Sequence, residues 1–154
     1  MLNLILSSLL FILPAYVANS TPVIACKLLG KYNLPIAKKT LGEGKTWGGF
    51  VFGILAGTLI GFLLGNLYLG ILLSVGALLG DILGSFIKRQ FKLKRGTPVP
   101  LLDQYDFLII AIAFATAVQT PTLAQLIIIL ILTPLLHLSA NFRAFTLKFK
   151  KEWW

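Results

Sequence analysis

The sequence predicts an all-α integral membrane protein with five transmembrane helices, its N-terminus outside the cell and its C-terminus in the cytoplasm. Of its 154 residues, 57% are hydrophobic, which is far above the share in a soluble domain. Its apolar stretches approach the length of about 20 residues that a helix needs to cross a bilayer. The 14 Lys and Arg residues fall in patches between these stretches, and such residues stay on the cytoplasmic side. Five spans with an outer N-terminus place every patch on that side.

The predicted boundaries treat residues 1–154 as a single domain. The spans cover about 2–18, 47–64, 67–87, 105–118 and 123–139. The cytoplasmic parts are the loops 19–46 and 88–104 and the tail 140–154. Their cations are Lys27, Lys31, Lys38, Lys39 and Lys45 in the first loop, Lys88, Arg89, Lys92, Lys94 and Arg95 in the second, and Arg143, Lys148, Lys150 and Lys151 in the tail.

The first three spans have distinct signals. The first is apolar from Leu2 and lacks the basic start of a cleaved signal peptide, so we expect a retained span with a kink at Pro14. It either ends near residue 18 or continues past residues 19–21 toward Ala25. The second and third carry small-residue ridges that let helix backbones approach closely in a membrane. These ridges are Gly49, Gly53, Gly57, Gly61 and Gly65 on the second span, and Gly76, Gly80 and Gly84 on the third. The ridges predict close helix packing, or else space for a substrate beside Asp81 and Ser85.

Turn residues delimit the remaining spans. Pro98 and Pro100 exclude a helix centre from the second loop, so the fourth span begins near Tyr105 and is short. Residues 119–122 form a turn before the fifth span. The aromatic and basic tail is expected to lie along the membrane surface.

Three aspartates stand out because an acid within a membrane is costly and usually functional. Asp81 lies in the third span, on the same helical face as Gly84, Ser85 and Lys88. Asp103 and Asp106 start the fourth span, where acids also serve as a helix cap and as first-turn acids. Together the three carboxylates supply hard oxygen ligands that suit Mg²⁺, and Mn²⁺ as well. A structural alternative is that Asp81 is neutralised by Lys88 or by a neighbouring helix.

The cations beside these acids suggest chemistry on phosphates. Lys88, Arg89, Lys94 and Arg95 surround the acids, and carboxylate-held metal with cations suits phosphoryl or nucleotidyl transfer. Lys45 and Thr46 are weaker candidates for a phosphate contact, because Thr46 is expected to cap the second span and helix N-termini attract anions. The net charge of +9 is explained by loops at the membrane, so nucleic acid is not an expected partner. Cys26 is the only cysteine, which excludes an internal disulfide.

The same residues carry a family resemblance. The segments Ser85–Arg89, Lys94–Gly96 and Leu101–Asp106 resemble the phosphatidate cytidylyltransferase signature, and 45–49 is similar to an earlier motif of that superfamily. The short chain, the turn expected at Asn19–Pro22, and Pro98 and Pro100 after the basic run resemble the archaeal branch, the CDP-archaeol synthases. Lys94-Arg95, Pro100-Leu101-Leu102 and Asp103-Gln104 replace the Lys-Asp, His-Gly-Gly and Asp-Arg of the bacterial and eukaryotic pattern, which favours the archaeal branch.

The resemblance implies CTP, Mg²⁺ and a membrane lipid phosphate, 2,3-di-O-geranylgeranylglycerol 1-phosphate, as reactants at the cytoplasmic face of the cell membrane. CDP-archaeol and pyrophosphate would be the products, and Asn19 would be a further nucleotide contact. The alternative within the superfamily is a CDP-diacylglycerol synthase acting on phosphatidic acid. A small cation channel or transporter is the alternative of another class, but transport sites lie near the membrane midplane and these acids lie at its edge among cations. A non-catalytic assembly factor would leave three costly aspartates without a role.

Overall fold

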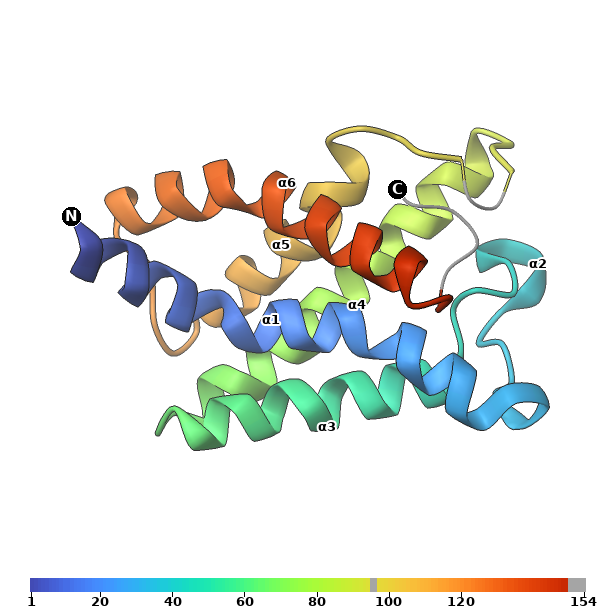
Figure 1. The fold of residues 1–154 in the computed structure, drawn as a ribbon, viewed down its shortest axis with the longest axis horizontal. Helices are drawn as coiled ribbons and strands as arrows, with labels where there is room; N and C mark the ends of the chain where they lie inside the picture. The colour runs from blue at the N-terminus through green and yellow to red at the C-terminus, as the bar shows by residue number, and fades with distance from the viewer. Residues whose placement is uncertain (95–96, 150–154) are drawn as a thin grey trace.

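The computed structural model describes residues 1–94 and 97–149, and in these residues it is all-helical (Figure 1). The described elements, in order, are α1 (Leu2–Leu29), η1 (Gly30–Tyr32), α2 (Lys38–Leu41), α3 (Trp47–Leu63), α4 (Leu67–Gln90), α5 (Leu102–Ala115) and α6 (Leu123–Thr146). Among the described residues the extended pairing is limited to a single antiparallel bridge between Pro35 and Thr46. The all-α prediction is therefore confirmed.

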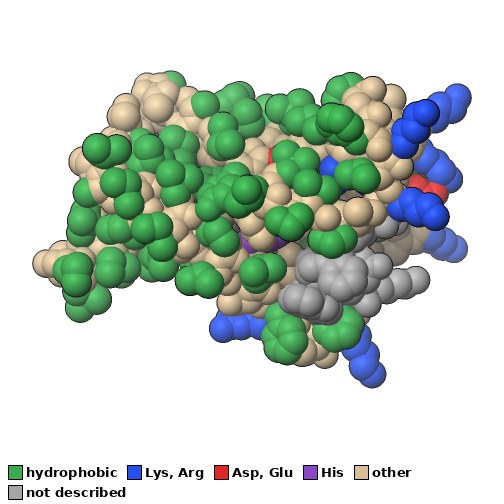
Figure 2. Space-filling model, turned by 90° about the horizontal axis from the view of Figure 1, so that it is seen from above, with side chains coloured by type: hydrophobic (Ala, Val, Ile, Leu, Met, Phe, Trp, Pro, Cys, Tyr) green, Lys and Arg blue, Asp and Glu red, His purple; other side chains and the backbone are tan. Residues whose placement is uncertain are grey.

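The five long helices run alternately in opposite directions (Figure 1). The ends of α1, α4 and α6 and the beginnings of α3 and α5 therefore lie toward the same end of the molecule, where α2 also lies. In Figure 2, hydrophobic side chains cover most of the visible face, and Lys and Arg gather mainly toward that end. The alternation explains how cations from separate loops reach one region.

Three described helices are long and apolar enough to cross a membrane, judged by length and composition. They are 2–32, Leu67–Gln90 and Leu123–Thr146. α3 is a shorter apolar helix of 17 residues, and α5 has 14 residues. Each of the five predicted spans thus corresponds to a helix, and three of these helices have membrane-spanning length.

The end of the first span at residue 18 is wrong, and the alternative continuation toward Ala25 is correct, because α1 runs through residues 19–29. The hydroxyls of Ser20 and Thr21 donate to the carbonyls of Tyr16 and Val17, so these polar side chains are satisfied within the helix. Pro22 has no N–H and leaves a carbonyl four residues earlier without its usual partner. Neighbouring helices can tolerate such a residue, and α1 packs extensively on α3 here.

The glycine ridges bring backbones into contact, as one of the two interpretations predicts. A Cβ at Gly70 would lie 2.6 Å from the Cα of Gly61, and a Cβ at Gly76 would lie 2.7 Å from the Cα of Ala111. The first contact joins α3 to α4 and the second joins α4 to α5. Gly65 lies outside the ridge, because its positive φ of 80° forms the turn after α3. The core of buried apolar side chains, including Ile12, lies between these helices.

α6 is joined to the bundle by two tyrosines near its proline. Pro134 has no N–H, and the hydroxyl of Tyr105 donates to the carbonyl of Leu130, four residues before it, at 2.9 Å. The hydroxyl of Tyr16 lies 2.7 Å from that of Thr133. α6 continues beyond the predicted end at residue 139, so the first part of the predicted tail is helical. The tail residues 150–154 lie outside the described residues.

Candidate active site

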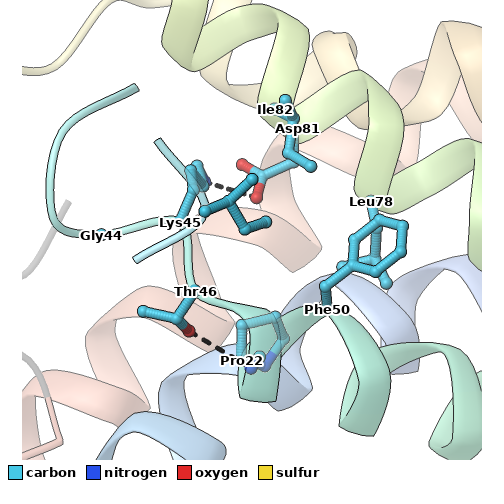
Figure 3. Close-up of a pocket in the computed structure, with 10 residues that line it drawn as sticks. Pro22, Gly44, Lys45, Thr46, Phe50, Leu78, Asp81 and Ile82 are labelled. Atoms are coloured by element: carbon cyan, nitrogen blue, oxygen red, sulfur yellow. Dashed lines mark hydrogen bonds and ion pairs between the residues drawn. The ribbon is translucent and has the colours of Figure 1, made fainter. Parts of the chain in front are cut away.

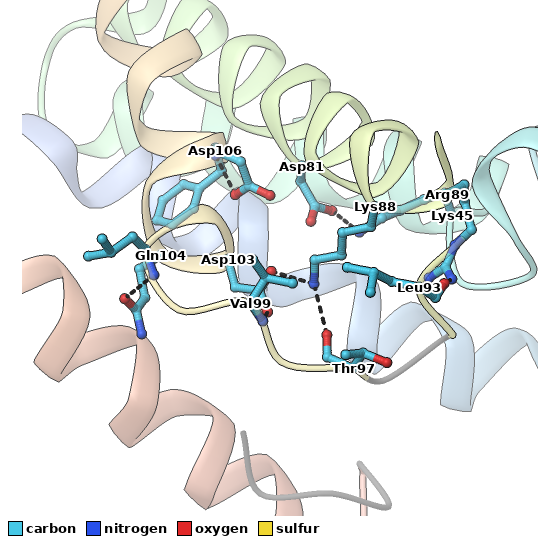
Figure 4. Close-up of polar contacts among 12 residues, drawn as sticks. Lys45, Asp81, Lys88, Arg89, Leu93, Thr97, Val99, Asp103, Gln104 and Asp106 are labelled. Carbon is cyan, nitrogen blue, oxygen red and sulfur yellow. Dashed lines mark hydrogen bonds and ion pairs between the residues drawn. The ribbon is translucent and has the colours of Figure 1, made fainter. Parts of the chain in front are cut away.

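The three predicted acids lie along the seam between α4 and α5. Asp81 is on α4, and Asp103 and Asp106 are on the first turns of α5. A Cβ at Gly80 would lie 2.7 Å from the Cα of Phe107, so this glycine lets the start of α5 approach α4 closely. Figure 4 shows the three acids in one region with Lys45 and Lys88. The structure therefore brings Asp81 and Asp106, which are 25 positions apart in the sequence, into one region.

Asp81 forms an ion pair with Lys45, which belongs to the loop before α3 (Figure 4). Lys45 was a weaker candidate than Lys88, yet it is the cation that contacts this acid. The two side chains are only 22% and 25% exposed, so water screens their attraction less than at an open surface. Asp81 is thus neutralised by Lys45 of the loop before α3, and not by Lys88 as one alternative held.

Asp103 forms an ion pair with Lys88, whose ammonium also donates to the carbonyl of Thr97 at 3.3 Å. The second carboxylate oxygen of Asp103 accepts from the N–H of Val99 at 3.1 Å. Asp103 was expected to cap α5, but the cap position is Leu101, with a φ of 70°, and Asp103 lies in the first turn. The proline-rich loop bends back there, which directs the carboxylate to the loop backbone and to Lys88.

Asp106 faces α4 from within α5. One of its oxygens, Oδ1, accepts from the N–H of Phe107 at 2.6 Å. A Cβ at Gly84 would overlap the other oxygen and lie 2.7 Å from the Asp106 Cγ. The space beside Asp81 that the ridge was expected to leave for a substrate is therefore filled by Asp106. A glycine at position 84 is required for this carboxylate to lie against α4.

A small pocket of about 20 Å³ lies beside the Asp81–Lys45 pair (Figure 3). Pro22 of α1, Thr46 and Phe50 of α3, and the loop residue Gly44 line it together with this pair. Ile36, Leu78 and Ile82 add apolar walls. The pocket joins one ion pair to apolar side chains from three helices, but in this structure it has room for only about one water molecule.

The first backbone N–H groups of α3 already have hydrogen-bond partners within the protein, which affects the predicted phosphate contact at Thr46. Thr46 caps the helix as expected, because its hydroxyl oxygen accepts from the N–H of Gly49 at 3.2 Å. The N–H of Trp47 donates to the carbonyl of Leu34, and the N–H of Gly48 donates to Asn33 Oδ1. Thr46 itself is only 6% exposed. A phosphate at this terminus would have to replace bonds that already exist.

The other predicted site residues lie at different distances from the acids. Arg89 donates to the carbonyl of Leu93, so its guanidinium is bound to the loop after α4. Lys94 is exposed and Ser85 is partly buried, one turn beyond Asp81. Asn19 lies within α1, not in a turn, about one turn before the pocket residue Pro22. Arg95 lies outside the described residues.

The carboxylate oxygens of Asp81, Asp103 and Asp106 are ligands that suit a hard divalent cation by their chemistry. Lysine ammonium groups, which suit phosphate oxygens, lie beside them. The carboxylates do not converge on one point, and the described residues contain no cluster of three acidic, histidine or cysteine side chains placed as metal ligands. Two of the three acids are instead paired with lysines. A metal ion that bound to Asp81 or Asp103 would therefore have to displace the lysine ammonium group from that carboxylate.

Sequence reasoning missed the residues that hold the Lys45 loop. Asn33 Nδ2 donates to Cys26 Sγ at 3.3 Å, and that sulfur lies 3.7 Å from the Thr46 hydroxyl. A single asparagine in a polar loop carries no sequence signal. At the exposed rim of the same loop, Lys38 pairs with Glu43 at 2.6 Å, which raises the pKa of the Lys38 ammonium above its ordinary value.

Comparisons with known proteins agree with this arrangement. The family model described as CarS-like, CDP-archaeol synthase, matches residues 1–69 and 61–154. CDP-archaeol synthases of Pyrococcus horikoshii and Methanocaldococcus jannaschii are 42% and 40% identical to the chain, over 99% of it and 99% and 98% of their own lengths. A solved structure of an intramembrane enzyme for archaeal membrane lipid biosynthesis is 37% identical, with a TM-score of 0.74 over 89% of this chain and 94% of that one. The chain belongs to the CDP-archaeol synthase family.

Proposed function

We propose that this protein transfers a cytidylyl group from CTP to 2,3-di-O-geranylgeranylglycerol 1-phosphate, giving CDP-archaeol and pyrophosphate. The observation that carries the proposal is the α4–α5 seam, along which three carboxylates and two partly buried lysines lie, in a chain of the CDP-archaeol synthase family. Such a site provides cations for phosphate oxygens, and apolar helices beside it suit a lipid substrate. A cation channel needs neither the lysines nor a place for a lipid substrate, and the lysines would repel its cation.

In the proposed reaction an oxygen of the lipid phosphate attacks the α-phosphorus of CTP, and the bond to the β-phosphate oxygen breaks. A phosphomonoester has a second pKa of about 6, so the attacking group is already largely ionised near neutral pH. The reaction therefore requires no general base. Pyrophosphate leaves with the electron pair of the broken bond.

Lys45 and Lys88 are the proposed phosphate contacts, because their partly buried ammonium groups lie beside the acids, Lys45 at Asp81 and Lys88 at Asp103 (Figure 4). Asp81, Asp103 and Asp106 would hold Mg²⁺, which when bound supplies positive charge for phosphate oxygens. Mn²⁺ would serve the same ligands. Ser85, Asn19, Thr46, Arg89, Lys94 and Arg95 are proposed as peripheral contacts around nucleotide or lipid phosphate.

We also propose that all five long helices span the cell membrane, with the active site on its cytoplasmic face. The alternating helix directions and the gathering of cations at one end support this orientation. Because Cys26 is the only cysteine, a Cys26→Ser background can report topology. A single cysteine at Thr40 should react with an impermeant maleimide only in inside-out vesicles, and one at Gln119 only in intact cells.

The decisive experiment measures pyrophosphate release from CTP and Mg²⁺ by the detergent-purified protein. Parallel samples contain the digeranylgeranyl ether lipid phosphate, phosphatidic acid or no lipid. Release with the ether lipid alone is expected, whereas comparable release with phosphatidic acid would assign the CDP-diacylglycerol reaction instead. Asp81→Asn should abolish release, and the matched Glu43→Gln variant, which alters an exposed acid 56% accessible to solvent, should not. No release in any sample from folded protein would contradict the proposal.

A further inference from the structure

The loop that carries Lys45 is fastened at its base by a short ladder of backbone bonds. The N–H of Ile36 donates to the carbonyl of Lys45 at 2.8 Å, and the N–H of Trp47 donates to the carbonyl of Leu34 at 3.0 Å. These two bonds flank the Pro35–Thr46 bridge. Residues 33–36 and 45–48 therefore form a two-stranded clamp immediately beside the Asp81–Lys45 pair.

Asn33 extends this clamp with its side chain. Its Oδ1 accepts from the N–H of Gly48 at 3.1 Å, which is the next rung after the Leu34–Trp47 bond. Its Nδ2 donates to Cys26 Sγ at 3.3 Å, which fixes the clamp to α1. A single amide thus connects the loop to two helices, and each end of the amide has the partner that its chemistry requires.

The fit at Gly48 depends on Asn33. A Cβ at position 48 would lie 2.6 Å from Asn33 Oδ1 and would also overlap the side chain of Leu29. Real Cβ atoms do not approach so closely, so any larger residue would displace the amide from the helix terminus. Asn33 and Gly48 are therefore a matched pair, and either can be altered to break the same contact.

We propose that Asn33 is a positioning residue for nucleotide binding, which holds the clamp so that Lys45 reaches the Asp81 side of the site. This inference rests on the proposed function, in which Lys45 is a phosphate contact, and it assigns that contact to the phosphates of CTP. Asn33 does not touch the substrate in this scheme. Its removal should weaken CTP binding through Lys45 and should leave the Lys88–Asp103 ion pair unchanged.

The test compares Asn33→Ala, Gly48→Ala, Lys45→Ala and the double variant Asn33→Ala/Lys45→Ala. A net hydrogen bond of ordinary strength corresponds to a change of about threefold to tenfold in KM for CTP. We expect that increase for Asn33→Ala and Gly48→Ala, with the KM for lipid phosphate and kcat changed less than about twofold. In the Lys45→Ala background, Asn33→Ala should have almost no further effect, because its action passes through Lys45.

Asn66→Ala is the matched control, because Asn66 Oδ1 also accepts from a backbone N–H, that of Leu69, at the start of α4. It should lower the melting temperature to a similar extent and leave the KM for CTP unchanged. Asn33→Asp, which keeps an oxygen acceptor for Gly48, should recover most of the lost CTP affinity. Equal effects of Asn33→Ala with and without Lys45, or a lower melting temperature with unchanged KM, would overturn the inference.

The outcomes also separate this inference from the proposed function. Wild-type protein that releases no pyrophosphate with any lipid would contradict the proposed function itself. Active wild-type protein with an unaltered Asn33→Ala KM would contradict only the role of Asn33. The shift in melting temperature that CTP produces gives a second binding measurement, and it should shrink in Asn33→Ala but not in Asn66→Ala.

Discussion

Replacing Gly84 with alanine should damage catalysis by moving one carboxylate. The added Cβ would overlap Asp106 Oδ2 and lie 2.7 Å from the Asp106 Cγ, and ordinary contacts begin at 3.4 Å, so the carboxylate must shift by at least about 0.7 Å. A misplacement of about 1 Å in an active site can reduce the rate about a hundredfold. We therefore expect kcat to fall about tenfold to a hundredfold. Overpacking between α4 and α5 should also cost about 1–3 kcal/mol of stability.

Gly76→Ala is the control for overpacking alone. Its Cβ would also lie 2.7 Å from a neighbouring atom, the Cα of Ala111, and it lies on the same helix against the same partner. The stability loss should be at least as large in Gly76→Ala, because its Cβ meets backbone atoms of α5, while kcat should stay within about threefold of wild type, since its Cβ meets no carboxylate. Turnover is measured as pyrophosphate release, and stability as the melting temperature in detergent. Equal kcat losses in the two variants would refute the assignment of Asp106 to the catalytic site.

Three further outcomes are expected. Asp103→Asn keeps an oxygen for the Val99 N–H but loses the charge opposite Lys88, so kcat/KM should fall about a hundredfold with little change in melting temperature; an active variant would contradict the role of the charge. Tyr105→Phe removes the bond to the Leu130 carbonyl and should lower the melting temperature by about 2–4 °C in thermal unfolding, with turnover retained. Removal of divalent metal with EDTA should stop pyrophosphate release, and Mg²⁺ should restore it; turnover in excess EDTA would exclude a metal role for the acids.

Much of the fold follows from local sequence signals. The apolar lengths indicated five helices, and the positive φ of Gly65 and the caps Thr46 and Asn66 lie where turn chemistry favours them. The signal failed at Pro22, because a proline and three polar residues normally indicate a helix end. The hydroxyls of Ser20 and Thr21 are satisfied by bonds within the helix, and the packing of α1 on α3, which is a tertiary effect, sustains the helix past the proline.

The site was predictable in its composition but not in its pairings. Charge and spacing indicated that Asp81, Asp103 and Asp106 act together, and the glycine ridge explains how α5 reaches α4. Which lysine pairs with which acid depends on how the loop before α3 folds back on α4, and no pattern within one helix contains that information. For this reason Lys45 was undervalued, while Lys88 paired with Asp103 and not with the acid on its own helix.

The pairings themselves suggest how the site changes its charge balance on binding substrate. In the structure Lys45 and Lys88 compensate Asp81 and Asp103, so each ion pair is nearly neutral before a nucleotide arrives. A triphosphate competes for the same ammonium groups, and leaving two partly buried carboxylates without partners is costly. Under the proposed function, nucleotide binding would therefore be favourable only if another cation, the proposed Mg²⁺, replaced the lysines at the acids. This coupling explains why acids and lysines occur together at one seam, an arrangement that a simple cation pathway would not require.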